Sequence, residues 1–247
     1  DMVQSRGLGD VYKRQVLITG ASRGIGHSAA KAFADAGWDL LLVSRSEAAL
    51  QSLASELRSG GSRVIHQSID FTDPSAIAPG IETLLSQGLR PSVLINNAGA
   101  AWTGNLLEMP LERWNWLMQL NLTSVYQVSA AVVPSMRPAG GLVINVSSHA
   151  ARNAFPGWGA YCTVKAALAS FTRCLAEEER SNGIRACTLT LGAVDTSLWD
   201  SPTVDSDFDR RAMLPVNQAA AALLHLAQQP ATQVVEDLTL MPATGAF

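Results

Sequence analysis

Short apolar runs alternate with longer amphipathic segments along most of the chain. β-Branched and leucine-rich runs lie at 16–19, 40–44, 63–69, 92–96, 142–147, 184–191 and 237–241. The segments between them place apolar residues three or four positions apart, as at Ala29, Ala32, Phe33 and Ala36, a spacing that predicts helices. Strands that alternate with helices favour a parallel sheet covered on both faces. The pattern therefore predicts an α/β fold, a Rossmann-like doubly wound sheet of about seven strands.

The same pattern predicts a single domain. The 247 residues, 47% of them hydrophobic, suffice for one large core, and neither an internal repeat nor a linker interrupts the alternation. We expect this domain to cover residues 16–247. The preceding stretch, DMVQSRGLGDVYKRQ, is polar and without periodicity, and we expect residues 1–15 to be disordered or a non-native extension.

The charge of the chain is small and evenly spread. The formal net charge is −3 and no run of Lys or Arg occurs, which argues against nucleic acid and anionic membranes as partners. The apolar runs fall well short of the roughly 20 residues that cross a bilayer, and no signal-peptide pattern opens the chain. These features favour a cytoplasmic protein that acts on a small molecule.

The cysteine and histidine residues show no disulfide or metal-ligand spacing. Three cysteines include no C-x-x-C pair, and an odd number gives no disulfide framework. The histidines stand far apart in the sequence, at His27, His66, His149 and His225. We expect no metal site.

A glycine-rich stretch, TGASRGIG at 19–26, follows the first apolar run and opens an Ala-rich helix. In such a turn Gly20 permits the tight bend, Gly24 lets a pyrophosphate approach, and Gly26 lets the helix pack closely on the strand. The N–H groups at the helix start then hold the phosphates. Candidate cofactor contacts here are Gly20, Ser22, Arg23, Gly24, Ile25 and Gly26. The alternative is an ordinary glycine-rich turn without a ligand.

The end of the second apolar run bears on the choice of cofactor. Dinucleotide sites for NAD place a carboxylate about 20 residues beyond the glycines, whereas this chain has Ser44 and Arg45 there. A hydroxyl and a guanidinium hold a 2′-phosphate by charge-assisted hydrogen bonds, and Arg23 adds a second cation. We expect NADP(H) as the preferred cofactor and NAD(H) as the second choice. Alternatively, Arg45 is only a solvated residue at the start of the next helix.

A tyrosine and a lysine stand four positions apart in AYCTVKAAL at 160–168. Residues i and i+4 share one helix face, so Tyr161 and Lys165 can reach the same ligand. A nearby ammonium favours the phenolate and lowers the pKa of a tyrosine, which suits Tyr161 to proton transfer at a carbonyl oxygen. The alternative is a core tyrosine whose hydroxyl is satisfied by the protein.

Together these motifs resemble the short-chain dehydrogenase/reductase family. Its marks occur in order: TGASRGIG at 19–26, Asp70, NNAG at 96–99, Asn121, Ser148, Tyr161 and Lys165. The resemblance runs from Val16 to the C-terminus. It implies a Rossmann-like fold and hydride transfer with a nicotinamide cofactor.

The resemblance implies a role for each catalytic candidate. Tyr161 exchanges a proton with the substrate oxygen, Lys165 tunes it and binds the nicotinamide ribose, and Ser148 hydrogen-bonds the same oxygen. Ser147 is the second choice for the serine. Asn121 holds a water that leads to the lysine, or else satisfies only local backbone groups.

Further cofactor contacts are also implied by the resemblance. They are Asp70 at the adenine amino group, Asn97, Ala98 and Gly99 on the adenine-ribose side, and Val194 and Thr196 at the nicotinamide carboxamide. In the last of these segments, LGAVDTSLW at 191–199, Leu191 stands where the family usually has proline.

Substrate is expected beyond the carboxyl ends of the strands. Candidate contacts are His149, Trp102, Phe155, Trp158 and Trp199, with Ser148 at the reacting oxygen. The aromatic residues predict an apolar pocket for a ketone of moderate size, or else serve packing and subunit contacts. Residues 197–213, with Asp, Pro and Ser interleaved, predict a mobile lid.

The sequence thus predicts an NADP(H)-dependent oxidoreductase that interconverts a carbonyl and an alcohol. A 3-oxoacyl-thioester reductase acting on an acyl-carrier protein shares every motif and stays open. A dinucleotide-binding sensor without catalysis is the alternative from another class, and the joint presence of Ser148, Tyr161 and Lys165 argues against it. The resemblance also implies a homodimer or homotetramer that pairs the helices at 111–136 and 161–181.

Overall fold

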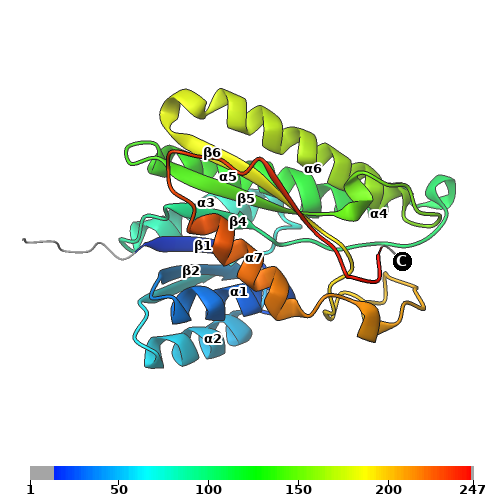
Figure 1. Cartoon of the computed structure of the whole chain (residues 1–247), viewed down its shortest axis with the longest axis horizontal. Coiled ribbons are helices and arrows are strands. Elements are labelled where there is room, and N and C mark those ends of the chain that lie inside the picture. The colour runs from blue at the N-terminus through cyan, green and yellow to red at the C-terminus, as the bar shows by residue number, and fades with distance from the viewer. Residues whose placement is uncertain (1–13, 246–247) are drawn as a thin grey trace, which may run out of the picture.

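A parallel sheet forms the centre of the molecule (Figure 1). The computed structural model describes residues 14–245, so the prediction for residues 1–15 falls almost wholly outside the described range. The strands are β1 (Gln15–Thr19), β2 (Asp39–Ser44), β3 (Val64–Ser68), β4 (Val93–Asn96), β5 (Gly141–Ser148), β6 (Ile184–Leu191) and β7 (Asp237–Leu240). Within the described range they form one seven-stranded sheet in the order β3-β2-β1-β4-β5-β6-β7. This confirms the predicted doubly wound α/β fold, with β1 beginning one residue earlier than expected.

Helices cover both faces of the sheet. The helices are α1 (Gly24–Asp35), α2 (Glu47–Ser59), α3 (Pro74–Ser86), α4 (Leu111–Met118), α5 (Ser124–Met136), α6 (Gly159–Glu178) and α7 (Val216–Ala227). One face carries α1, α2 and α7, and the other carries α3, α5 and α6 (Figure 1). Short helical turns lie at η1 (Leu106–Glu108), η2 (Gln119–Thr123), η3 (His149–Ala151), η4 (Arg180–Asn182) and η5 (Arg210–Ala212).

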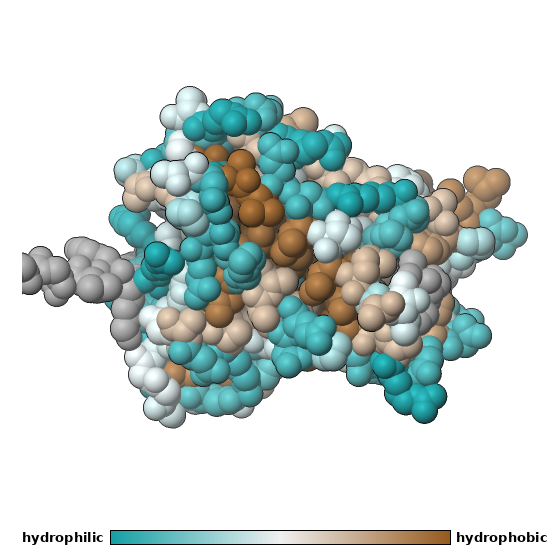
Figure 2. Space-filling view, in the orientation of Figure 1, coloured by the Kyte–Doolittle hydropathy of each residue, from teal (hydrophilic) through white to brown (hydrophobic). Residues whose placement is uncertain are grey.

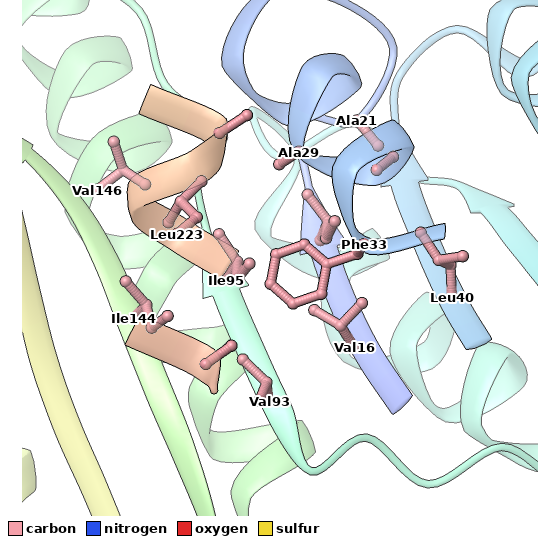
Figure 3. Close-up of a cluster of buried hydrophobic side chains, with 14 of the residues drawn as sticks. Val16, Ala21, Ala29, Phe33, Leu40, Val93, Ile95, Ile144, Val146 and Leu223 are labelled. Atoms are coloured by element: carbon pink, nitrogen blue, oxygen red, sulfur yellow. The ribbon is translucent and has the colours of Figure 1, made fainter. Parts of the chain in front are cut away.

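The pleat of the strands divides the core into two clusters. Val16 and Ile18 pack under α1 and α7, whereas Leu17 between them joins the cluster under α3 and α5. In Figure 3 the ring of Phe33, from α1, lies beside Ile95 of β4 and Val16 of β1, and Leu223 of α7 lies on the other side of Ile95. Both faces of a central strand are therefore buried, which explains why the apolar runs are continuous rather than alternating.

The predicted long helix at 111–136 is not regular. It is one continuous helical stretch, but a π-helical turn, η2, separates α4 from α5. Asn121 lies in this turn and its Nδ2 donates to the Leu117 carbonyl oxygen, 3.0 Å away. π-Turns of this kind often mark functional sites, because the extra residue redirects a side chain.

The strand order reverses between β1 and β4, which places a crevice at their carboxyl ends. The turn after β1 and the NNAG segment after β4 meet there, since Asn97 Nδ2 donates to the carbonyl oxygens of Thr19 (3.0 Å) and Gly20 (3.3 Å). The fold thus brings two motifs together that are about 75 residues apart in sequence.

Three further features of residues 14–245 bear on function. No helix of this range is long and apolar enough to span a bilayer. No three of its His, Cys, Asp and Glu side chains lie together as the ligands of a metal ion would. The cysteines Cys162, Cys174 and Cys187 are present as thiols.

Candidate active site

The glycine turn after β1 is packed so tightly that side chains would not fit. A Cβ at Gly26 would lie 2.3 Å from the Gly20 carbonyl oxygen and 2.6 Å from Asn97 Nδ2. Gly20 itself has φ +67°, and its Cβ would lie 2.9 Å from the Ala98 Cα. The turn thus packs against Asn97 and Ala98, and the Asn97 side chain holds the turn in place through its hydrogen bonds to the Thr19 and Gly20 carbonyl oxygens.

The first turn of α1 faces the crevice without a capping side chain. The N-cap residue Arg23 makes no side-chain cap hydrogen bond, and no acidic residue lies in this turn of the described chain. Gly20, Arg23, Gly24 and Ile25 line the cavity, whereas Ser22 and the buried Gly26, which were also predicted as cofactor contacts, do not. Gly24 has φ +55°, and the atoms nearest to a Cβ there are those of the Thr196 side chain at 3.5 Å. Exposed N–H groups, small residues and a cation form a cradle that fits a phosphate group.

Some of the predicted adenosine-side residues lie away from this cavity. Ser44 is buried, and its Oγ has no hydrogen-bond partner among the described residues, whereas the side chain of Arg45 is exposed. Asp70 Oδ1 accepts hydrogen bonds from the Thr72 backbone N–H (2.9 Å) and hydroxyl (2.7 Å). Arg45 and Asp70 also lie outside the cavity lining.

The catalytic candidates meet in one cavity of about 230 Å³, which Asn121, Ser148, Tyr161 and Lys165 all line. Lys165 is 6% exposed, and its Nζ donates to the Val146 carbonyl oxygen at 3.0 Å. The same Nζ lies 5.7 Å from the centre of the Tyr161 ring. The first two turns of α6 and the end of β5 therefore bring the serine, tyrosine and lysine together, although the serine is distant in sequence.

Burial controls the protonation of the tyrosine and lysine. It raises the pKa of Tyr161 to about 12, and a hydrogen bond with Ser148 opposes this rise. Burial also lowers the pKa of Lys165 to about 8. The sequence interpretation, in which the lysine lowers the pKa of the tyrosine, is not matched, because loss of hydration outweighs the other contributions. Near neutral pH Tyr161 is protonated and Lys165 is mostly charged, as suits a proton donor beside a cation.

Asn121 is held by backbone groups at the floor of the cavity. It is 1% exposed, and its Oδ1 accepts from the Ala100 N–H at 3.3 Å. A Cβ at Gly99 would lie 2.6 Å from this oxygen and 3.8 Å from Lys165 Nζ, so only glycine fits there. These contacts agree with the alternative in which the Asn121 side chain only hydrogen-bonds nearby backbone groups. The water-holding role of Asn121 stays a prediction.

The loop after β6 closes one side of the cavity with Val194 and Thr196, and their contact with the nicotinamide stays a prediction. Arg210, which the sequence reasoning missed, ties this loop together. Its Nε donates to Asp195 Oδ1 (2.6 Å), its Nη1 to Asp200 Oδ1 (3.0 Å) and its Nη2 to the Thr196 carbonyl oxygen (2.9 Å). In the sequence, the only indication of this role is that Arg210 follows Asp195 and Asp200 within 15 residues and so could pair with them. The predicted mobility of residues 197–213 stays a prediction.

Aromatic side chains line the part of the cavity beyond Tyr161. Phe155, Trp158 and Trp199 lie there as predicted, together with His149. Trp102 does not line the cavity, because its ring folds back over Gly104, whose Cβ would lie 2.4 Å from Trp102 Cη2. Phe208, which the motifs did not single out, takes a place beside Trp199 with ring centres 5.4 Å apart. Its segment carries no motif, so only the folded chain reveals it.

Known proteins resemble this chain over most of its length. The family model of the short chain dehydrogenases matches residues 14–206. Sulfoacetaldehyde reductase 2 from Chromohalobacter salexigens is 32% identical over 241 residues, which cover 94% of this chain and 95% of that protein. A 3-oxoacyl-(acyl-carrier-protein) reductase from Chlamydia muridarum is 30% identical over 190 residues, 76% of this chain and 77% of that protein.

Solved structures give the same picture. An alcohol dehydrogenase from the archaeon Thermococcus sibiricus, complexed with 5-hydroxy-NADP, matches with a TM-score of 0.86 and 28% identity, covering 94% of this chain and 97% of that one. L-Sorbose reductase from Gluconobacter frateurii, complexed with NADPH and L-sorbose, matches with a TM-score of 0.84 and 25% identity over 93% and 95% of the two chains. The sheet order, the motifs at its carboxyl edge and these similarities agree, and the chain belongs to the short-chain dehydrogenase family of oxidoreductases.

Proposed function

We propose that this protein is an NADP(H)-dependent oxidoreductase that interconverts a carbonyl and an alcohol, with Tyr161 as general acid and base. The observation that carries the proposal is that Ser148, Tyr161 and Lys165 line the same cavity as the glycine turn. A reactive carbonyl and a nicotinamide have to lie side by side for hydride transfer, and this one cavity is lined both by the residues expected to bind the cofactor and by those expected to bind the carbonyl.

The cofactor fits the turn because glycine is required there and the first turn of α1 has no capping side chain among the described residues. Gly20, Gly24 and Ile25 would hold the pyrophosphate, and Val194 and Thr196 the nicotinamide end. Arg23 and the exposed Arg45 would hold the 2′-phosphate, which favours NADP(H) over NAD(H). The 5-hydroxy-NADP and NADPH named for the two solved structures support this choice.

The chain's own residues would supply the proton chemistry. The bound cofactor donates the hydride in reduction and accepts it in oxidation. Ser148 and Tyr161 hydrogen-bond the carbonyl oxygen, and the Tyr161 hydroxyl donates its proton there as negative charge develops. The charge of Lys165 behind the ring stabilises the tyrosinate that results. In the oxidation of an alcohol, the tyrosinate takes the proton back.

Two other functions are kept as alternatives. A 3-oxoacyl-thioester reductase shares this machinery, but the relative with that name matches less of the chain, 76% against 94% for the sulfoacetaldehyde reductase. A sensor that binds the dinucleotide without catalysis would have no need for a lysine that is buried beside a tyrosine and bonds a carbonyl oxygen rather than a carboxylate, since burying a charge without an ion-pair partner lowers stability.

A kinetic assay separates these functions. We expect NADPH oxidation, followed by its absorbance, with ketones or aldehydes, and less with a 3-oxoacyl thioester. Thr163→Ala is a matched control for substitutions on α6, because Thr163 is exposed on the same helix and its hydroxyl donates only to the Gly159 carbonyl oxygen among the described groups. Tight NADPH binding without turnover of any carbonyl would support the sensor instead.

We further propose a homodimer or homotetramer. Two surfaces support it: the helical stretch at 111–136, where Leu111 is 71% and Tyr126 58% exposed, and the edge at β7. Figure 2 shows an apolar band along the C-terminal segment, where Leu238 and Leu240 are only partly buried. Light scattering after size exclusion tests the assembly, and a monomer at micromolar concentration contradicts it. The cytoplasmic location stays a prediction.

A further inference from the structure

Four rings form one wall of the cavity beyond the reacting hydroxyls. This aromatic wall consists of Phe155, Trp158, Trp199 and Phe208. Trp158 packs edge-on against Tyr161 with ring centres 5.7 Å apart, and Trp199 lies 5.8 Å from Trp158. Phe208 lies 5.4 Å from Trp199 and completes the row. A substrate whose carbonyl reaches Tyr161 therefore places its adjoining group against these rings.

The polar groups of this part of the cavity are nearly all engaged already. Trp199 Nε1 donates to the Val194 carbonyl oxygen at 2.8 Å. His149 Nε2 lies 2.8 Å from Asn153 Nδ2, and its ring is 6.1 Å from that of Phe155. Ser147 and Ser197 also line the cavity, and the Ser147 Oγ is buried without a hydrogen-bond partner among the described residues. In the proposed reaction the hydroxyls of Ser148 and Tyr161 both serve one carbonyl oxygen.

Charged side chains are scarce on the substrate side. Among the described residues that line the cavity, the lysine and arginine side chains are those of Lys165 and Arg23. Lys165 is buried behind Tyr161 on the Val146 carbonyl oxygen, and Arg23 belongs to the glycine turn. Arg210, in the loop nearby, already serves Asp195 and Asp200. An anionic group on the substrate would therefore lose its hydration without gaining a partner.

We propose that the substrate is a neutral ketone or aldehyde whose carbonyl is attached to an aromatic or similarly flat apolar group. This inference rests on the proposed function. It sets the chain apart from the sulfoacetaldehyde reductase it resembles, whose named substrate carries a sulfonate, and from L-sorbose reductase, whose named substrate carries several hydroxyls. In the reaction the carbonyl carbon receives the hydride supplied by NADPH, the oxygen receives the Tyr161 proton, and NADP⁺ and the alcohol are released.

A matched pair of aldehydes tests the charge preference. Benzaldehyde and 4-formylbenzenesulfonate share the ring and the aldehyde and differ in one sulfonate. We expect kcat/KM with NADPH to be at least about 30-fold higher for benzaldehyde, because burying an unpaired anion is unfavourable. The sulfonate activates the aldehyde chemically, so its own reactivity works against this outcome. Equal or faster turnover of the sulfonate, or of sulfoacetaldehyde, overturns the inference and leaves the proposed function intact.

Ring variants test the contact with the wall. Phe208→Ala and Trp158→Leu should lower kcat/KM for benzaldehyde about 5- to 30-fold, since each removes apolar surface from the bound ring. The same variants should change kcat/KM for glyceraldehyde less than about 3-fold. Leu107→Ala, at an apolar residue of η1 that is 94% exposed and does not line the cavity, is the control and should change neither value. Phe208→Leu keeps an apolar side chain and should recover part of the loss.

A measurement of cofactor binding separates the role of the aromatic wall from that of the cofactor site. NADPH affinity, measured by its fluorescence, shows whether each variant keeps the cofactor site. Unchanged benzaldehyde kinetics in Phe208→Ala and Trp158→Leu, with NADPH affinity retained, overturn the role of the aromatic wall. No NADPH oxidation with benzaldehyde, glyceraldehyde, sulfoacetaldehyde or a 3-oxoacyl thioester, with NADPH still bound, overturns the proposed function itself.

Discussion

Adding one methyl group at Gly26 should disrupt the cofactor turn. The Cβ of alanine would lie 2.3 Å from the Gly20 carbonyl oxygen and 2.6 Å from Asn97 Nδ2, whereas ordinary contacts begin near 3.4 Å. The turn or the start of α1 therefore has to retreat by about 1 Å. Asn97, whose Nδ2 bonds the carbonyl oxygens of Thr19 and Gly20, has to move with it.

The size of the effect follows from these contacts. Overpacking costs about 1–3 kcal/mol, and weakening of the two hydrogen bonds costs about 0.5–1.5 kcal/mol each. The helix preference for alanine over glycine returns about 1 kcal/mol. The net loss in the free energy of unfolding is about 1–5 kcal/mol, or a fall in Tm of about 2–20 °C for a domain of this size. We also expect NADPH affinity to fall at least about tenfold, because the turn would hold the pyrophosphate.

Gly60→Ala is the control for this experiment. Gly60 follows α2 with φ −81°, and its Cβ would lie 3.4 Å from the Leu57 carbonyl oxygen, an ordinary contact. Its Tm should stay within about 3 °C of the original protein. Calorimetry and NADPH fluorescence titration provide the two readouts. A Gly26→Ala variant as stable as Gly60→Ala would refute the packing argument, and a less stable one with unchanged NADPH affinity would refute the assignment of the turn to the cofactor.

Three further predictions concern charge and protonation. Arg45→Asp should weaken NADPH binding about 10- to 100-fold and leave NADH binding within about threefold, since only NADPH carries the 2′-phosphate; an unchanged ratio of the two dissociation constants contradicts this role. Arg210→Ala should weaken NADPH binding about 3- to 30-fold, because it loosens the loop that carries Thr196. Arg211→Ala removes the neighbouring arginine, which is paired with Asp209, and should leave NADPH binding unchanged. Equal effects of the two substitutions would contradict the role of Arg210 in holding this loop. The pKa of Lys165 is lowered to about 8, so kcat/KM for NADPH should fall as the pH rises through that value and the lysine loses its proton. Lys165→Arg should remove this fall. A flat profile to pH 10 in the original protein speaks against a charged lysine in the reaction.

The sequence predicted the sheet and the central residues well, because these follow from local patterns. Each apolar run became a strand, since a strand buried on both faces needs an unbroken apolar sequence. Tyr161 and Lys165 share a helix face for the same local reason. The glycine turn could be interpreted from its place between a strand and a helix.

Properties that depend on tertiary packing were less accessible. The sequence does not reveal that Ser44 Oγ points into the protein, that the Trp102 ring folds over Gly104, or that Phe208 joins the cavity. The pKa of Tyr161 also depends on burial, which outweighs any effect of the lysine that spacing alone suggests. The π-turn at Asn121 interrupts a segment whose apolar pattern looks helical throughout.

Tyr161→Phe tests the role of Tyr161 as proton donor, because it removes one hydroxyl and keeps the ring that packs against Trp158. The measurement is the rate of NADPH oxidation with benzaldehyde, alongside the NADPH dissociation constant of the same variant. We expect a loss of at least about 100-fold in kcat with NADPH affinity within about threefold of the original, since general acid catalysis contributes about 10²–10⁴-fold. A variant that keeps more than a tenth of the original kcat would contradict Tyr161 as the proton donor.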